Sequence, residues 1–205
     1  MPQRNGRTLP RSFYARGVEE VARDLLGCSL VLGTAADRLG GRIVEVEAYG
    51  GPGDPGSHAD RAPGGRARIM FGPPGIAYVY FTYGMHHCMN AVTAAEGVGS
   101  AVLIRALEPR WGLERMRGAG FPSALGDHKL TSGPGRLCRA LGIDLRHYGW
   151  DLTKGLLRIV SGPAPDVVFD GLRIGLTRDD GRRWRFWTAS PSVSRPSVSR
   201  SSVSR

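Results

Sequence analysis

The chain has 205 residues, of which 41% are hydrophobic, and this is enough for one domain with a buried core. No apolar run approaches the roughly 18 residues of a membrane span, and residues 1–11 are basic without the apolar core of a secretory signal, so we expect a soluble protein. The three cysteines are widely spaced and match no metal-ligand pattern, which argues against a disulfide framework or a zinc site. The formal net charge of +10 favours a polyanionic partner such as nucleic acid, although a general bias toward arginine is the alternative.

The first predicted elements are a helix and two strands. Apolar residues recur with helical spacing from Val18 to Leu26, Gly27 is expected to end this helix, and Ser29 to Leu32 follows as a strand. Arg42 to Tyr49 alternates between apolar and polar residues, which is the pattern of a half-buried strand. We expect one face of this strand to carry Val44, Val46 and Ala48, and the other, outward face to carry Glu45, Glu47 and Tyr49.

The middle of the chain predicts a long loop followed by a hairpin. Residues 50–75 are rich in Gly and Pro and show no period, and a loop of this length in a compact domain is often functional. Ile76 to Tyr83 and His87 to Thr93 are strand-like and meet around Gly84, which permits the turn. A buried strand follows at Ala101 to Ala106.

The remaining elements are two helices and four short strands. The helices are expected at Pro109 to Arg117 and at Pro134 to Leu141, the second preceded by Ser132 and Gly133 as cap and turn. The strands are expected at Leu157 to Val160, Val167 to Phe169, Leu172 to Leu176 and Arg185 to Thr188. Together these elements predict a single α+β domain with a mainly antiparallel sheet.

The two ends of the chain differ from the domain between them. We expect a basic N-terminal arm at residues 1–8, the domain at residues 9–190 and a tail at residues 191–205. The tail repeats Ser-Val-Ser-Arg three times and has no apolar face to bury, so we expect it to be disordered. Without its three arginines the rest of the chain keeps a net charge of +7, because 10 minus 3 is 7, and the basic character therefore belongs to the domain.

The strand with two carboxylates is the first candidate for chemistry. On their own, Glu45 and Glu47 are typical of a solvated strand face. Tyr49 on the same face and His58 in the loop change that interpretation, because a carboxylate and two flat rings on one side predict a pocket for a flat base. Glu45, Glu47 and His58 could also hold a divalent cation, a weaker alternative since no recognisable metal-ligand cluster is present.

The hairpin is unusually rich in aromatic residues. If residues 84–86 form its connection, Tyr83 opposes His87 and Tyr80 opposes Asn90. Tyr83 and Met85 would then stand at the tip, where large apolar side chains can wedge between DNA base steps. Ordinary sheet packing remains the alternative for the strand tyrosines, and a plain turn for the two adjacent histidines.

Several segments together resemble the alkyladenine (3-methyladenine) DNA glycosylase family. They are Gly41–Tyr49 (GRIVEVEAY), Met70–Gly75 (MFGPPG), Tyr78–Asn90 (YVYFTYGMHHCMN), Val102–Pro109 (VLIRALEP), Leu130–Leu137 (LTSGPGRL) and Arg173–Gly175 (RIG). The resemblance covers roughly Leu9 to Arg195, in family order. Residues 64–67 depart from the family pattern, and residues 196–205 have no counterpart in it.

The resemblance implies a curved antiparallel sheet with flanking helices and a protruding β-hairpin. It implies that Glu47 is the general base that activates water, and that Arg105 and the main-chain carbonyl of Ile174 hold this water. Tyr49, His58 and Tyr80 would sandwich a base that has been flipped out of the duplex. The backbone amide of His58 would also contact the edge of that base.

Further residues are matched to the family's contacts with DNA. Asn90 corresponds to the side chain that crowds the exocyclic amino group of guanine. Tyr83 would fill the gap left in the base stack, and Met85 would widen the minor groove beside it. Arg66 keeps a positive charge within the divergent segment at residues 64–67, where we expect it to contact DNA.

The sequence therefore predicts a base-excision-repair enzyme that hydrolyses the N-glycosidic bond of alkylated or deaminated purines. The expected substrates are 3-methyladenine, 7-methylguanine, hypoxanthine and ethenoadenine in double-stranded DNA. Because the candidate amines, which are Lys129, Lys154 and the N-terminus, lie outside the pocket motifs, we expect a monofunctional enzyme that uses water and needs no cofactor. We also expect a monomer without a membrane partner, located in the cytoplasm at the nucleoid if bacterial and in the nucleus if eukaryotic.

Two other functions remain open at this stage. A non-catalytic, damage-sensing DNA-binding module would keep the fold and the wedge, but it has no use for Glu47 and Arg105 together. A sugar or nucleoside hydrolase could use Glu45 and Glu47, but it would explain neither the charge nor the wedge.

Overall fold

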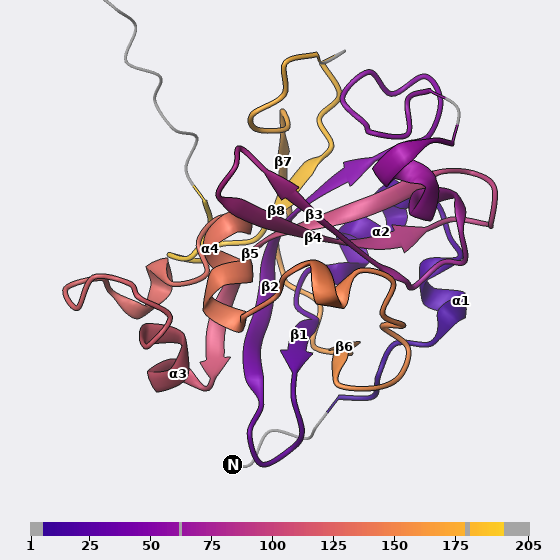
Figure 1. The fold of residues 1–205 in the computed structure, drawn as a ribbon. Helices are drawn as coiled ribbons and strands as arrows, with labels where there is room; N and C mark the ends of the chain where they lie inside the picture. Colours follow the sequence, from indigo (N-terminus) through magenta and orange to yellow (C-terminus); the bar gives the residue numbers. More distant parts are fainter. Residues whose placement is uncertain (1–5, 62, 179–180, 195–205) are drawn as a thin grey trace, which may run out of the picture.

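A curved antiparallel sheet runs through the centre of the molecule, as the computed structural model shows (Figure 1). The structure describes residues 6–61, 63–178 and 181–194. The strands are β1 (Ser29–Leu32), β2 (Leu39–Tyr49), β3 (Ala77–Thr82), β4 (His86–Thr93), β5 (Ser100–Trp111), β6 (Leu157–Val160), β7 (Phe169–Gly171) and β8 (Arg185–Trp187). Their order is β3-β4-β5-β2-β1-β6, and β8 joins β2 and β7. The predicted α+β fold with a curved, mainly antiparallel sheet and a projecting hairpin is confirmed.

Helices lie against this sheet and close its core. The α-helices are α1 (Arg11–Tyr14), α2 (Val18–Leu25), α3 (Leu113–Arg117) and α4 (Pro134–Leu141), and the 3₁₀ helices are η1 (Gly65–Phe71), η2 (Asp127–Lys129) and η3 (Leu145–His147). Helix α2 packs on β2 through Val21, Ala22 and Leu25, which follow the predicted helical spacing. Helix α4 packs on β4, at the bounds that the sequence predicts. Across the described ranges, no helix is long and apolar enough to cross a membrane.

Strand β2 is the central strand, and both of its faces are covered. Glu45 and Glu47 are 0% exposed, so the expectation that they point outward into solvent is wrong. The alternation is also broken, because the pairing of β2 with β5 shifts register between Ile43 and Val46. Through this bulge Ile43, rather than Val44, joins Val46 and Ala48 in the main hydrophobic cluster.

The helix predicted at Pro109 to Arg117 begins later than expected. Strand β5 continues through Pro109 to Trp111, and α3 starts only after Gly112, whose φ of +76° breaks the strand. Pro109 pairs with Gly41 of β2, where a side chain would collide with the carbonyl oxygen of Glu108. The strand therefore persists because a glycine on the partner strand lets the two backbones approach closely.

The predictions for the C-terminal strands and for both chain ends also differ from the structure. The strand predicted at Val167 to Phe169 begins only at Phe169, and residues 172–176 form no strand. Instead, residues 172–176 form hydrogen bonds beside the pocket, from the side chain of Arg173 to Asp54 and from the amide of Ile174 to Glu47. At the N-terminal boundary, Arg7 donates its amide to Ser161 and Thr8 bridges to Val160, so these two residues are part of the domain rather than a loose arm.

The domain also extends further toward the C-terminus than the boundary at residue 190. Ser192 and Ser194 are buried, and the amide of Ser194 donates to Glu45 across 2.6 Å. The expectation of a disordered tail is therefore wrong for this short segment. The rest of the predicted tail, residues 195–205, and residues 1–5 of the predicted arm lie outside the described residues.

Candidate active site

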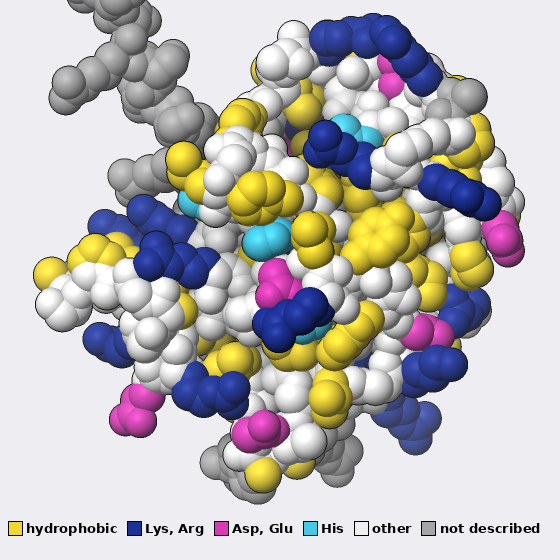
Figure 2. Space-filling view, viewed as in Figure 1, with side chains coloured by type: hydrophobic (Ala, Val, Ile, Leu, Met, Phe, Trp, Pro, Cys, Tyr) yellow, Lys and Arg dark blue, Asp and Glu magenta, His cyan; other side chains and the backbone are white. Residues whose placement is uncertain are grey.

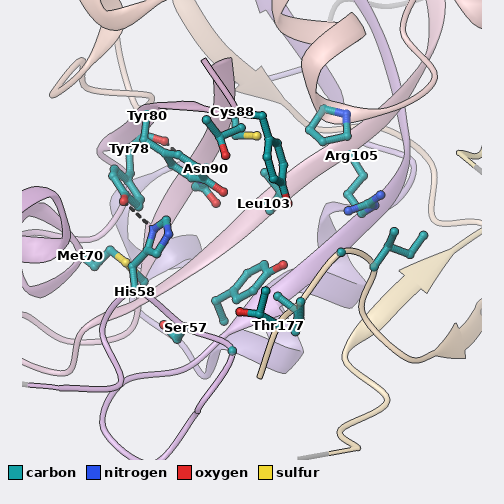
Figure 3. Close-up of a pocket in the computed structure, with 18 of the residues that line it drawn as sticks. Ser57, His58, Met70, Tyr78, Tyr80, Cys88, Asn90, Leu103, Arg105 and Thr177 are labelled. Atoms are coloured by element: carbon teal, nitrogen blue, oxygen red, sulfur yellow. Dashed lines mark hydrogen bonds between the residues drawn. The ribbon is translucent and has the colours of Figure 1, made fainter. Parts of the chain in front are cut away.

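A pocket of about 550 Å³ opens between the hairpin, the loop after β2 and the segment before β8 (Figure 3). Its walls include Tyr49, His58, Tyr80, Tyr83, Asn90, Arg105 and Ile174, all predicted from the sequence. Glu47, Met85 and Arg66 do not line it. The structure thus brings seven of the ten expected residues to one pocket, and the other three lie behind it or on the nearby surface.

One wall of the pocket is aromatic. The rings of His58 and Tyr80 meet edge to face with their centroids 4.7 Å apart, and Tyr78 lies next to Tyr80 at 5.2 Å. The hydroxyl of Tyr78 lies 2.8 Å from Nδ1 of His58 (Figure 3). Burial raises the pKa of Tyr78 well above its usual range, so this phenol keeps its proton in the hydrogen bond with the imidazole.

His58 is held in the neutral form at neutral pH. Its side chain is open to solvent, yet desolvation by the pocket walls and the charge of Arg66 lower its pKa below the usual 6.5. Arg66 lies on η1 and is exposed, close enough to act on His58 electrostatically. A neutral imidazole can stack against a cation without repelling it.

The register of the hairpin differs from the prediction by two residues. Tyr78 opposes Asn90, and Tyr80 opposes Cys88, so the predicted pair of Tyr80 and Asn90 is wrong. The connection is residues 83–85, because Tyr83 and Gly84 adopt φ values of +51° and +66° and leave the strand one residue earlier than expected. A shift of two residues preserves the faces, and Tyr80 and Asn90 both still line the pocket. Asn90 is buried and donates Nδ2 to the carbonyl of Tyr78 across 2.9 Å.

The hairpin tip exposes apolar side chains, as predicted. Tyr83 is 76% exposed and Met85 is 68% exposed. Figure 2 shows arginine and lysine side chains and exposed hydrophobic ones on one face of the molecule, with some acidic side chains among them. Exposed apolar side chains on a turn suit contact with the inside of a polyanion's groove.

Glu47 lies directly behind the pocket and receives three hydrogen bonds. Its Oε2 accepts from Nη1 of Arg105 at 2.9 Å and from the hydroxyl of Tyr49 at 2.7 Å. Its Oε1 accepts from the amide of Ile174 at 2.7 Å. The resemblance implied a role for the carbonyl of Ile174, and the structure shows its amide bonded to Glu47. All three donors line the pocket, so the carboxylate is one layer from the cavity.

The electrostatics of this group follow from burial and pairing. Burial, together with the neighbouring Glu47, raises the pKa of Tyr49 well above its usual range, so the phenol stays a donor. Burial alone would lower the pKa of Arg105, but Glu47 and Glu45 more than offset this and raise it. Arg105 therefore remains a cation beside both carboxylates.

The groups that surround Glu45 were not predicted from the sequence. This carboxylate accepts from Arg105, from Nε of Arg185 at 2.7 Å and from both the hydroxyl and the amide of Ser194. One signal was available: two carboxylates on a strand that becomes buried need two cations nearby. The alternation alone left burial open, and so it gave no reason to look for the second cation.

A second ion pair was also missed. Arg173 binds Asp54 with two parallel hydrogen bonds of 2.7 and 2.8 Å, and both side chains are fully buried. Burial alone would raise the pKa of Asp54, but the bonds from Arg173 and from the amide of Gly50 overcome this and lower it. The pair joins the loop that carries His58 to the segment that carries Ile174, so it holds two sides of the pocket together.

Glu45, Glu47 and His58, the candidates for a divalent cation, do not form a metal cluster in the described structure. Within the described part of the chain, no group of three His, Cys, Asp or Glu side chains is placed to hold a metal ion. Glu45 and Glu47 are instead neutralised by guanidinium groups, and His58 bonds to Tyr78.

Comparisons with known proteins point to one family. A family model described as Methylpurine-DNA glycosylase (MPG) matches residues 12–192. A protein of Streptomyces avermitilis is 49% identical over 193 residues, which cover 91% of this chain and 90% of its own length. A protein of Methanocella arvoryzae is 46% identical over 192 residues (91% and 96%), and one of Bradyrhizobium diazoefficiens is 43% identical over 185 residues (90% and 89%). All three are provisionally assigned as 3-methyladenine DNA glycosylases.

Proposed function

The chain belongs to the methylpurine-DNA glycosylase family, and from this premise we propose that it excises alkylated or deaminated purines from duplex DNA. The proposed substrates are 3-methyladenine, 7-methylguanine, hypoxanthine and ethenoadenine. The enzyme would flip the base into the pocket and hydrolyse its N-glycosidic bond, leaving an abasic site for base-excision repair. The observation that carries this proposal is that Glu47 is buried directly behind an aromatic pocket. Arg105 and Ile174, which donate hydrogen bonds to Glu47, line this pocket.

The N-glycosidic bond breaks through an oxocarbenium-like sugar, which calls for a carboxylate that stabilises positive charge and takes a proton from water. A carboxylate has about four acceptor sites, and the described donors use three of those on Glu47. The remaining site is on Oε1, beside the amide of Ile174. We assign the attacking water to this site, where Arg105 and the carbonyl of Ile174 could also hold it.

Water is favoured over an amine as the nucleophile. Lys129 lies on η2 and Lys154 follows Asp151, and neither side chain lines the pocket. A lyase reaction would need an amine within reach of the sugar. The enzyme is therefore proposed to be monofunctional.

The pocket also accounts for the proposed substrates. An N3- or N7-alkylated purine carries a positive charge, and stacking on aromatic faces can favour a cation by roughly 0.5–2 kcal/mol. Tyr49, His58 and Tyr80 supply such faces. Asn90 is held by the Tyr78 carbonyl and would crowd the 2-amino group of a normal guanine.

Base release from defined duplexes tests this function. The full chain would be incubated with duplex oligonucleotides that each carry one 3-methyladenine, 7-methylguanine, hypoxanthine or ethenoadenine, with a chelator present. We expect release of at least one of these bases and an alkali-labile abasic site, without strand cleavage by the protein itself. Tight lesion binding without any base release would instead support a damage-sensing module.

A further inference from the structure

Glu45 lies behind Arg105, on the side away from the pocket. It is 0% exposed and accepts four hydrogen bonds. Oε1 accepts from Nε of Arg105 at 3.0 Å, from Nε of Arg185 at 2.7 Å and from the hydroxyl of Ser194 at 2.8 Å. Oε2 accepts from the amide of Ser194 at 2.6 Å. Glu45 thus joins β2, β5, β8 and the C-terminal segment at one carboxylate.

The guanidinium of Arg105 is oriented by three different partners. Nε donates to Glu45, Nη1 donates to Glu47, and Nη2 lies 3.3 Å from the hydroxyl of Ser194. Because the guanidinium is planar, fixing Nε and Nη2 also fixes where Nη1 points. Glu45 and Ser194 therefore determine how Arg105 meets Glu47, and Figure 3 shows Arg105 across the pocket from His58 in that view.

Charge balance links the same residues. The cluster contains two carboxylates, Glu45 and Glu47, and two guanidinium groups, Arg105 and Arg185. Without the charge on Glu45, two guanidinium groups would face Glu47 alone. A carboxylate held by excess positive charge is a weaker base toward water.

We propose that Glu45 and Ser194 are positioning residues for base excision: they hold Arg105 in the plane from which it contacts Glu47, and Glu45 balances the second guanidinium. This inference rests on the proposed function, in which Glu47 and Arg105 act on water. Neither Glu45 nor Ser194 lines the pocket, so neither touches the flipped base. Their loss should therefore slow the chemical step and leave lesion binding nearly unchanged.

The chain provides a matched control within the same short segment. Ser192 is buried like Ser194, but its hydroxyl has no hydrogen-bond partner among the residues that the structure describes. Ser192→Ala and Ser194→Ala thus remove the same atom from neighbouring buried sites. Only the second loses contacts to Glu45 and Arg105.

The experiment measures chemistry and binding separately in the full chain. Single-turnover release of methylated purines from dimethyl-sulfate-treated duplex DNA gives the excision rate. Affinity for a duplex with a tetrahydrofuran abasic analogue gives binding. We expect Ser194→Ala to lower the rate by roughly tenfold and Glu45→Gln by roughly 100-fold, the scale of a misplaced catalytic group. Binding should stay within about threefold, and Ser192→Ala should match the parent in both measurements.

A double-mutant cycle separates positioning from support of the fold. If Ser194 acts through Arg105, Ser194→Ala should cost much less in an Arg105→Lys protein than in the parent. Equal costs in the two backgrounds, or a Ser194→Ala rate equal to that of Ser192→Ala, would overturn the inference. The serine variants keep this test valid even if Glu45→Gln does not fold.

Glu47→Gln, measured in parallel, distinguishes this inference from the proposed function. Near-parent excision by Glu47→Gln would contradict the proposed function itself. Loss of excision by Glu47→Gln, together with parent rates for Glu45→Gln and Ser194→Ala, would overturn only the positioning roles.

Discussion

Glu47→Gln tests the proposed base with little change of shape. The amide oxygen can still accept from Arg105 and Tyr49, whose donors now lie 2.9 and 2.7 Å from Oε2. The new NH₂ group then faces the amide of Ile174, 2.7 Å from Oε1, so that two donors oppose each other. Breaking a buried ion pair from one side costs about 3–5 kcal/mol of folding free energy. A typical domain has about 5–15 kcal/mol, so we expect the variant to fold with a lowered melting temperature.

The effect on catalysis should be larger than the effect on binding. Removing a general base typically costs about 10²- to 10⁴-fold in rate. At 1.36 kcal/mol per factor of ten, this corresponds to about 2.7–5.4 kcal/mol of barrier. Single-turnover excision of hypoxanthine from duplex DNA measures it, and binding of the same uncleaved duplex should stay within about tenfold of the parent because the pocket walls are unchanged.

A surface variant supplies the control for this measurement. Glu96 is exposed in the turn between β4 and β5, so Glu96→Gln makes the same chemical change away from the site. It should match the parent in rate and in melting temperature. A Glu47→Gln rate within about threefold of the Glu96→Gln rate would show that Glu47 is not the base, since even a modest general base contributes about 100-fold.

Three further predictions concern the tip, the floor and one wall of the pocket. Tyr83→Ala should weaken lesion binding in duplex DNA by roughly 1–3 kcal/mol, the value of one base-stacking contact; an equal loss on single-stranded substrate would indicate a role inside the pocket instead. Asn90→Ser should increase excision of mispaired guanine relative to hypoxanthine by roughly 10-fold or more, because relieving a clash with one small group is worth about 1–3 kcal/mol; an unchanged ratio in a folded variant would refute the gatekeeper role. The lowered pKa of His58 keeps its imidazole neutral above the usual value of 6.5, so affinity for 7-methylguanine, a cation, should fall only as the pH drops below that value. Measured in a Glu47→Gln background, this loss should be absent for neutral hypoxanthine and reduced by His58→Gln.

Local patterns together with the family resemblance were sufficient to predict most of the pocket. The spacing along the hairpin placed Tyr80 and Asn90 on one face, and an error of two residues in register left that face unchanged because side chains alternate with a period of two. The glycine-rich loop after β2 was correctly expected to bring His58 near Tyr49. These predictions depended on short stretches of chain and on the resemblance, not on tertiary contacts.

Burial and long-range pairing could not be predicted in the same way. The alternation in Arg42 to Tyr49 is compatible with one solvated face, whereas Glu45 and Glu47 are buried by groups from distant segments, among them Arg185 of β8 and the amide of Ile174. Ser194 reaches Glu45 across 149 residues of sequence, from a segment whose composition suggests disorder. The bulge near Val44 could not be predicted from the sequence either, because nothing in the local sequence marks the extra residue.

The proposed substrates pose an electrostatic problem that the arrangement of charges addresses. A protein with a net charge of +10 attracts the phosphate backbone, but the same charge near the pocket would repel a purine that is itself a cation. In the catalytic cluster two guanidinium groups are matched by two carboxylates, and His58 is kept neutral by its lowered pKa. Arg66 is exposed at the surface near the pocket, and its charge helps to lower the pKa of His58. If the pocket accepts an alkylated base as proposed, a substitution that removes one carboxylate from this balanced cluster should lower the excision of cationic lesions more than that of neutral ones.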